Sequence, residues 1–578
     1  MTTEVAAAPV PVGPAPVPEV EPASVQPEGT RHAAPGGTWV PPVPTVVVGV
    51  LVVAAGLVGL YLRLWLTFFA PSSSDEGFAG IIAQQALHGH FQAFYGGQQY
   101  GGTAEPYLIA AAFSVFGQSI VVARLVLVAL VAVGAVLVWR IALRVVGIQS
   151  VALMAAALAW SAPAVTLRTS VRVYGFRGVA LVCGLTAILF ALRIHDGRRR
   201  WPEFAVLGMA LGLGWWSTPE IAYVAVPVLV LLALGLVRTP AGERRWWWPR
   251  AGAALTAFAV GAIPWIWANV RSHLGSLDTA EFAGHHVTYA GRLGVFFHRV
   301  LPMVLGLTRF NDGRQLFGGG HQLLEVGFLT IIVAALVLCL LRGGAALAMA
   351  AGVVTFPFVY ALSPASWSWG DGRYSYFLPP LMAVVLAAGA TEAVRRVGLT
   401  RSAGSWLMAV VLAASTTLCV VGTRALVTFQ RNAYTANWGN PDDATLRAID
   451  RMEAAGIRTA YADYWVAYKL DYLARGRLAV TTVGYDNDRS PAYDTAVDDS
   501  SHPAWLFVPL SEGSIEATQF TGPSLTVAVD GVNQAGFEQK LDRLGVPYKV
   551  LDFGILRAVV PDRTLSQAQL GMPGASSP

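Results

Sequence analysis

The chain has 578 residues, of which 54% are hydrophobic and only 13% carry a charge, whereas soluble globular domains carry about 25% charged residues. So few charges cannot cover a soluble protein of this length, which excludes a cytosolic enzyme, a secreted disulfide scaffold and an intrinsically disordered chain. The net charge of +5 is unevenly spread: basic residues outnumber acidic ones by 27 to 17 before residue 431, and acidic residues outnumber basic ones by 18 to 13 from there on. The composition predicts a membrane protein with a soluble C-terminal part.

The N-terminal segment, residues 1–43, is rich in Pro, Ala, Val and Glu. It has neither a helical period nor the basic and apolar pattern of a signal peptide. We expect a disordered cytoplasmic tail.

Runs of about twenty apolar residues, the length that crosses a bilayer as a helix, recur along the chain and predict about eleven transmembrane helices. Arginine clusters occupy alternate loops, and the positive-inside rule places these loops and the N-terminus in the cytoplasm. An odd number of spans then places the C-terminal part outside. The runs lie near 45–70, 119–143, 151–167, 176–194, 203–217, 220–237, 251–270, 322–341, 344–362, 375–394 and 404–428.

Three predicted outer segments are long enough to hold chemistry: 71–118, 271–321 and the part after 429. In the last of these, capped amphipathic helices alternate with short strand-like runs, which predicts a small extracytoplasmic α/β domain over 430–578 with a flexible end. The predicted fold is therefore a polytopic α-helical membrane domain over 44–429 followed by that domain.

Two acidic residues, Asp75 and Glu76, directly follow the first apolar run. Carboxylates at the membrane boundary are costly unless they are paired or functional, although the first turn of a solvated helix also favours acids. A carboxylate in an enclosed outer pocket could act as general base for an acceptor hydroxyl.

Downstream of this pair, paired glycines stand among aromatic, amide and acidic side chains. Aromatic faces stack on sugar rings and amides bond to hydroxyls, so the mixture suits sugar binding, although paired glycines also occur in ordinary loops. A Pro-Glu turn at the outer end of another span is a further candidate contact. The candidates are Tyr95, Gln98, Tyr100, Glu105 and Glu220.

Four arginines lie on the predicted outer side, against the positive-inside pattern: Arg168, Arg172, Arg177 and Arg373. A guanidinium fork binds phosphate well, and the alternative for each residue is snorkelling at a helix end. As a group they favour a phosphate site. In the C-terminal domain, the aromatic side chains of 464–468 are either core residues or the lining of an acceptor groove.

A divalent metal is a rival idea, because His88 and His90 could join Asp75 or Glu76 as ligands. Two histidines two positions apart on a helix would not share a face, however. No cofactor is firmly implied, and a metal remains open.

The Asp75-Glu76 pair after the first span resembles the polyprenyl-phosphate-dependent glycosyltransferases of the GT-C superfamily, in the branch of protein O-mannosyltransferases and aminoarabinose transferases. The stretches "GQQYGGTAEPYL", "GRYSYFLPPL" and "YADYWVAYKL" are similar to bacterial members. The resemblance implies Asp75 as catalytic base, Glu76 as a positioning residue and inversion at the anomeric carbon. It also places Arg373 at the donor phosphate, with Tyr374 beside it in the site.

The predicted function is thus transfer of a sugar from a polyprenyl-phosphate donor to a hydroxyl of a cell-envelope glycan, lipid or protein. The expected location is the outer face of a bacterial plasma membrane, and nucleic acid is not an expected partner. The alternative is a polytopic transporter or flippase. A third possibility is an inactive scaffold that binds partners through its outer domain.

Overall fold

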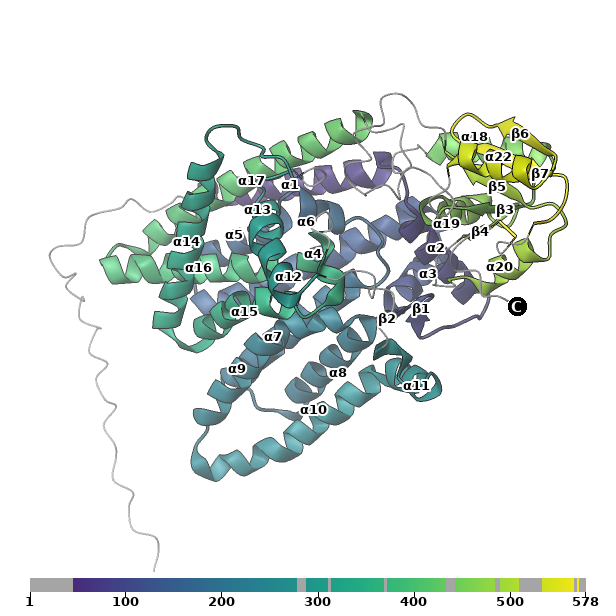
Figure 1. Ribbon diagram of the computed structural model, residues 1–578. Coiled ribbons are helices and arrows are strands. Elements are labelled where there is room, and N and C mark those ends of the chain that lie inside the picture. The colour runs from purple at the N-terminus through teal and green to yellow at the C-terminus, as the bar shows by residue number, and fades with distance from the viewer. Residues whose placement is uncertain are drawn as a thin grey trace, which may run out of the picture. The chain divides into compact units, whose positions relative to one another are not determined.

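The computed structural model describes residues 45–277, 287–309, 313–367, 372–432, 442–483, 489–508, 533–565 and 569–570 (Figure 1). The predicted N-terminal tail, 1–43, lies outside these ranges. The predicted outer segment 271–321 is described except for 278–286 and 310–312.

Within the described ranges, seven helices are long and apolar enough to cross a bilayer, and two further helices bent by 62° would make an eighth span. The chain is thus a multi-pass membrane protein. The seven are α1 (Thr45–Phe69), α4 (Ile120–Val146), α7 (Arg177–His195), α9 (Ala225–Val237) with the 3-10 turn η1 (Pro219–Val224), α14 (His321–Arg342), α16 (Leu378–Val397) with η7 (Gly372–Ser375), and α17 (Arg401–Asn432).

Shorter helices occupy the remaining predicted positions, so a helix coincides with each of the eleven runs, and the number that cross the membrane stays a prediction. The bent pair is α10 (Trp247–Gly261) and α11 (Ile263–Arg271); the others are α5 (Gln149–Trp160), α8 (Trp201–Ser217) and α15 (Gly344–Tyr360). Between the spans lie α2 (Ser74–Leu87), β1 (Phe94–Tyr95), β2 (Gln98–Gly102), α3 (Ala104–Phe116), α6 (Ala164–Thr169), η2 (Ala241–Trp246), η3 (Gly275–Leu277), α12 (Tyr289–Val295), the π-helical turn η5 (Phe296–Val300), α13 (Leu301–Val304) and η6 (Pro364–Trp367).

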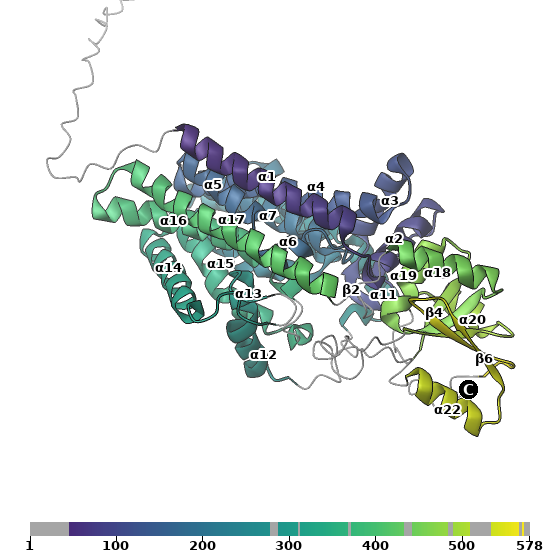
Figure 2. The same ribbon diagram turned by 90° about the horizontal axis from the view of Figure 1, so that it is seen from above.

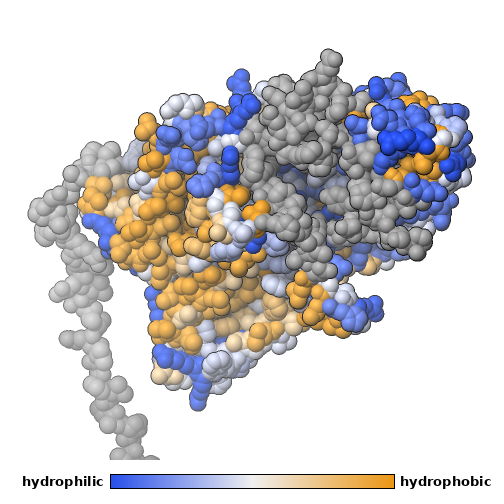
Figure 3. Space-filling model, viewed as in Figure 1, coloured by the Kyte–Doolittle hydropathy of each residue, from blue (hydrophilic) through white to orange (hydrophobic). Residues whose placement is uncertain are grey.

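The helices are packed so that segments distant in sequence become neighbours. Helices α1 and α17, from the two ends of the membrane domain, lie side by side in both ribbon views (Figures 1 and 2). Helices α7 and α16 are the most enclosed of the seven, whereas α14 is largely exposed, with Leu323 80% accessible. Apolar residues cover much of the surface of the membrane domain in Figure 3. Such a continuous apolar surface indicates contact with lipid.

Four of the loops that are predicted to be cytoplasmic lie close together. Arg144 in the last turn of α4 pairs with Asp196 after α7 at 3.0 Å, and Arg342 at the end of α14 donates to the Val145 carbonyl at 2.9 Å. Arg238 after α9 is 2.7 Å from His195. These contacts therefore join the ends of α4, α7, α9 and α14 at one end of the bundle.

The C-terminal region forms a five-stranded mixed sheet in the order β4-β3-β5-β7-β6, as the predicted α/β domain requires. Strands β3, β4 and β5 are parallel, and β7 runs antiparallel to β5 and β6. The elements are α18 (Asp442–Ala454), β3 (Thr459–Ala462), α19 (Tyr464–Ala474), β4 (Ala479–Thr482), α20 (Pro491–Asp498), β5 (Ala504–Phe507), α22 (Gln534–Arg543), β6 (Tyr548–Asp552) and β7 (Arg557–Pro561). Helix α19 packs directly on α2, which brings this sheet region to the Asp75-Glu76 pair.

Candidate active site

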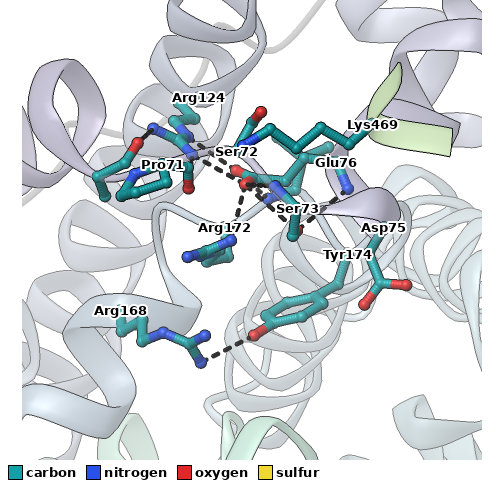
Figure 4. Close-up of polar contacts among 12 residues, drawn as sticks. Pro71, Ser72, Ser73, Asp75, Glu76, Arg124, Arg168, Arg172, Tyr174 and Lys469 are labelled. Atoms are coloured by element: carbon teal, nitrogen blue, oxygen red, sulfur yellow. Dashed lines mark hydrogen bonds and ion pairs between the residues drawn. The ribbon is translucent and has the colours of Figure 1, made fainter. Parts of the chain in front are cut away.

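The Asp75-Glu76 pair lies in the first turn of α2, whose start is set by a capping box. The Ser73 hydroxyl accepts from the Glu76 amide at 3.5 Å, and the Glu76 carboxylate accepts from the Ser73 amide at 3.1 Å. Such a box satisfies backbone donors that a helix start leaves unpaired. Because successive helix residues project about 100° apart, the box sends the neighbouring Asp75 carboxylate in another direction, as Figure 4 shows.

Glu76 is fully buried and held by two arginines. Arg124 from α4 donates to its two carboxylate oxygens at 2.7 and 2.8 Å, and Arg172 donates at 3.0 Å. Arg124 also donates to the carbonyls of Ala70 and Pro71 after α1, at 2.7 and 3.0 Å. Burial by itself raises the pKa of Glu76, but the two guanidinium groups outweigh it and lower this pKa to about 2. Glu76 therefore joins α1, α2 and α4 as a permanent anion.

Asp75 has a different environment. Its side chain is 14% exposed, and it receives a hydrogen bond of 2.5 Å from the Tyr464 hydroxyl in α19. Arg373 in η7 lies 3.5 Å from its Oδ2 atom, and Arg489 lies 4.0 Å from its Oδ1 atom. Asp75 is thus reachable by a ligand and is flanked by cations from two distant segments.

Aromatic side chains surround this carboxylate. The Tyr95 hydroxyl donates to the Asp75 backbone carbonyl at 2.9 Å. The Arg373 guanidinium lies 5.0 Å from the Tyr174 ring and 5.4 Å from the Tyr374 ring. Such cation–π contacts orient a guanidinium without neutralising its charge. Arg168 donates to the Tyr174 hydroxyl at 3.2 Å (Figure 4).

The C-terminal domain is fastened to the start of α2. Asp442 accepts from the amide and the hydroxyl of Ser72 at 3.0 and 2.8 Å, and it pairs with Lys469 at 2.9 Å. The Lys469 amide in turn donates to the Ser74 hydroxyl at 3.3 Å. These bonds hold two of the serines that lie just before Asp75, Ser72 and Ser74, against the C-terminal domain.

The approach of α19 to α2 depends on glycine at position 77. A β-carbon there would lie 2.3 Å from the Tyr468 carbonyl oxygen, a backbone atom that cannot rotate away. Overpacking of this kind typically costs about 1–3 kcal/mol. We expect Gly77→Ala to lower the thermal unfolding temperature of the purified protein and to reduce activity by displacing Tyr464 from Asp75.

The control for this substitution is Gly56→Ala in α1, where a β-carbon meets no atom within 4 Å. Both substitutions add one methyl group to a helix, so only the contact with α19 distinguishes them. An unfolding temperature for Gly77→Ala equal to that of Gly56→Ala would contradict the close approach.

The other predicted arginines and acids are partly paired with one another. Arg172 serves Glu76, and Arg177 forms two bonds of 2.5 and 3.1 Å with Glu220. Glu105 is buried and accepts from the Gly178 amide at 2.7 Å, so it caps the start of α7. These contacts indicate that the residues hold neighbouring parts of the protein in place. Their contacts with a substrate remain predictions.

The remaining predicted residues lie near the site to different degrees. Gln98 and Tyr100 are half-buried on β2, and the Tyr100 ring lies 6.1 Å from the Phe176 ring. His88 and His90 are exposed, and His88 ends α2 while Asp75 begins it. The structure does not bring these histidines to Asp75 or Glu76, and among the described residues no group of three His, Cys, Asp or Glu side chains could hold a metal ion.

Three residues of the site were missed in the sequence. Arg124 interrupts the apolar run of α4, and a charge inside a span is a signal that could have revealed it. Tyr174 and Arg489 lie in polar segments and carry no comparable signal. Arg489 precedes α20 in the C-terminal domain, where charged residues are common.

A cavity of about 500 Å³ lies between the end of α1, the start of α4 and the C-terminal domain. Its lining includes Arg124, Asp442 and Arg475, but not Asp75. This cavity is therefore not lined by the carboxylate that Arg373 and Arg489 flank.

Comparison with known proteins agrees with the predicted resemblance. Residues 103–267 match the family described as dolichyl-phosphate-mannose-protein mannosyltransferase. None of the curated proteins matches the chain. In fold, the chain is similar to ArnT from Cupriavidus metallidurans bound to undecaprenyl phosphate, at 15% identity and a TM-score of 0.52, covering 90% of this chain and 98% of that one.

The apo state of the same ArnT gives a TM-score of 0.51 at 15% identity, over 89% and 98% of the two chains. An oligosaccharyltransferase from Archaeoglobus fulgidus gives 0.46 at 14% identity, over 79% and 67%. The expected resemblance to GT-C glycosyltransferases is confirmed at the level of fold.

Proposed function

We propose that the protein is a membrane glycosyltransferase that moves a sugar from a polyprenyl-phosphate donor to a hydroxyl of a cell-envelope glycan, lipid or protein. The observation that carries the proposal is the contrast between two adjacent carboxylates. Glu76 is buried and neutralised by Arg124 and Arg172, whereas Asp75 stays accessible between Arg373 and Arg489. The ArnT of similar fold binds undecaprenyl phosphate, which supports a lipid phosphate as the donor group.

In the proposed reaction Asp75 takes the proton of the acceptor hydroxyl, and the acceptor oxygen bonds to the anomeric carbon. The bond from that carbon to the phosphate oxygen breaks on the opposite side, and the phosphate leaves with the electron pair. The configuration is therefore inverted. Cations that meet the growing negative charge of the phosphate lower the barrier, and Arg373 and Arg168 are the proposed partners.

The remaining predicted residues have supporting roles in this proposal. Glu76 positions the turn that carries Asp75, and Glu220 orients Arg177. The half-buried Tyr100 offers an aromatic surface to the sugar, whereas the buried Tyr95 and Tyr374 hold the Asp75 backbone and the Arg373 guanidinium. Gln98 offers amide hydrogen bonds, and no step requires a metal.

We propose that the reaction takes place at the outer face of a bacterial plasma membrane, with the N-terminus in the cytoplasm. The site and the C-terminal domain lie together, whereas the arginine-rich loops meet elsewhere through Arg144 and Arg342. The positive-inside rule assigns the latter end to the cytoplasm. Protease digestion of intact cells carrying a C-terminal tag tests this orientation, and a protected tag would contradict it.

The function is tested with the purified full chain in lipid nanodiscs, supplied with radiolabelled polyprenyl-phosphate sugars and an envelope extract. We expect label to move from the donor to the extract and unlabelled polyprenyl phosphate to accumulate. The same protein in sealed vesicles tests the alternative: movement of the labelled lipid across the membrane without cleavage would replace the transferase proposal by a flippase.

A further inference from the structure

Arg489 is a buried cation that the C-terminal domain contributes to the site. Its side chain is 3% exposed. Its guanidinium lies 4.5 Å from the Tyr464 ring and 5.7 Å from the Phe78 ring. Among the described residues, the Asp75 carboxylate lies 4.0 Å from this guanidinium, which is an electrostatic contact rather than a hydrogen bond.

The guanidinium has donors that remain to be satisfied. Within the part of the chain that the structure describes, its Nε and Nη1 atoms are buried and have no hydrogen-bond acceptor. A guanidinium carries five N–H donors in a planar fork, and buried donors without acceptors are destabilising. The neighbouring Tyr464 and Phe78 rings cannot replace acceptors for these N–H groups. The side chain is therefore arranged for an acceptor that arrives from outside the protein.

The charges around Asp75 indicate the sign of that acceptor. Asp75 faces two guanidinium groups, Arg373 and Arg489, and Glu76 likewise faces two, Arg124 and Arg172. Each carboxylate thus balances only one of its two cations. An anion beside Asp75 would remove this excess of positive charge.

The position of Arg489 is fixed by the outer loop that carries β1 and β2. A β-carbon at Gly96, between these strands, would lie 2.4 Å from the Arg489 carbonyl oxygen. The backbone of the loop therefore packs directly on the backbone of Arg489. This contact, with the Tyr464 hydrogen bond to Asp75, holds the guanidinium on the Oδ1 side of the carboxylate while Arg373 lies on the Oδ2 side.

We propose that Arg489 binds the phosphate of the polyprenyl-phosphate donor, so that the C-terminal domain completes the donor site by supplying a residue to it. The inference rests on the proposed function, and it assigns the binding of the donor phosphate partly to a residue outside the membrane domain. A phosphate oxygen accepts from the free edge of the guanidinium, and a planar fork matches phosphate geometry better than an ammonium group does. The contact strengthens as the sugar leaves, because the phosphate then gains a negative charge.

The test measures equilibrium binding of polyprenyl phosphate to the full chain in nanodiscs, with inorganic phosphate as a second ligand. Loss of a hydrogen bond to a charged group predicts about 10- to 100-fold weaker binding by Arg489→Gln, with a smaller loss for Arg489→Lys. Arg458→Gln is the matched control, since Arg458 is an exposed arginine of the same domain paired with Glu453. It should bind like wild type.

The outcomes separate this inference from the proposed function. Wild-type affinity in a folded Arg489→Gln variant would overturn the inference, as would equal losses in Arg489→Gln and Arg458→Gln. If Arg489→Gln does not fold, Arg489→Lys is measured, and unchanged affinity there would also overturn it. A parallel loss for inorganic phosphate identifies the phosphate group as what is recognised, and a loss for the lipid alone identifies the lipid-linked form.

The transfer assay of the wild type decides the proposed function independently. If lipid binding depends on Arg489 but the wild type transfers no sugar, the phosphate site is supported and the proposed reaction is rejected. Transfer by the wild type, with polyprenyl phosphate binding equally well to Arg489→Gln, would keep the reaction and reject the site.

Discussion

Asp75→Asn is expected to lower the rate of sugar transfer by about 10²- to 10⁴-fold, the usual contribution of a general base. The amide keeps the size of the carboxylate but cannot accept the proton of the acceptor hydroxyl. Binding of polyprenyl phosphate should persist, because Arg373 and Arg489 remain and lose an intramolecular anion. The measurement pairs single-turnover transfer with equilibrium binding of the donor lipid.

The control is Asp443→Asn, which neutralises an exposed aspartate at the start of α18 that pairs with its helix neighbour Arg447. Its transfer rate should match that of wild type. Transfer by Asp75→Asn at the wild-type rate would reject Asp75 as the base, and loss of lipid binding together with transfer would assign it to binding instead.

Glu76→Gln is expected to destabilise the folded protein rather than to slow one step of sugar transfer. The substitution leaves Arg124 and Arg172 buried without a carboxylate, and breaking a buried ion pair in this way costs about 3–5 kcal/mol. The expected result is a large fall in the thermal unfolding temperature, with transfer lost in proportion to folded protein. Native stability combined with lost transfer would instead make Glu76 a direct participant.

The pH dependence of stability provides an independent check on Glu76. Its pKa in the folded protein is about 2, below the ordinary value of 4.5, because Arg124 and Arg172 outweigh the effect of burial. Because this pKa is lowered, the ionised carboxylate stabilises the folded protein fully at pH values above 4.5. This stabilisation is lost as the pH falls from 4.5 towards 2. Unfolding temperatures of the wild type should therefore fall more steeply over this range than those of Glu76→Gln. Unfolding temperatures that fall equally in the wild type and in Glu76→Gln would contradict the lowered pKa of Glu76.

Local features of the sequence determined much of the architecture. Every predicted apolar run coincides with a helix, because a long apolar segment is visible in the sequence without its packing partners. In the C-terminal domain, the amphipathic runs 441–456 and 534–545 contain α18 and α22, and the strand-like runs 458–462, 477–483, 504–510 and 548–553 contain β3, β4, β5 and β6. Helix α19 was missed because its aromatic residues pack against α2 and obscure any amphipathic period.

The composition and order of residues thus determined the membrane class, the position of the acidic pair after the first span, and the α/β character of the C-terminal part. Only the tertiary structure decided which carboxylate of the pair faces the site. It also decided that Arg172 and Arg177 are paired with acids, and that Tyr464 and Arg489 reach Asp75. Apolar periodicity is a local property of the chain. The charge state and orientation of a buried group, by contrast, depend on partners brought to it by folding, and Tyr464 lies 389 residues from Asp75 in the sequence.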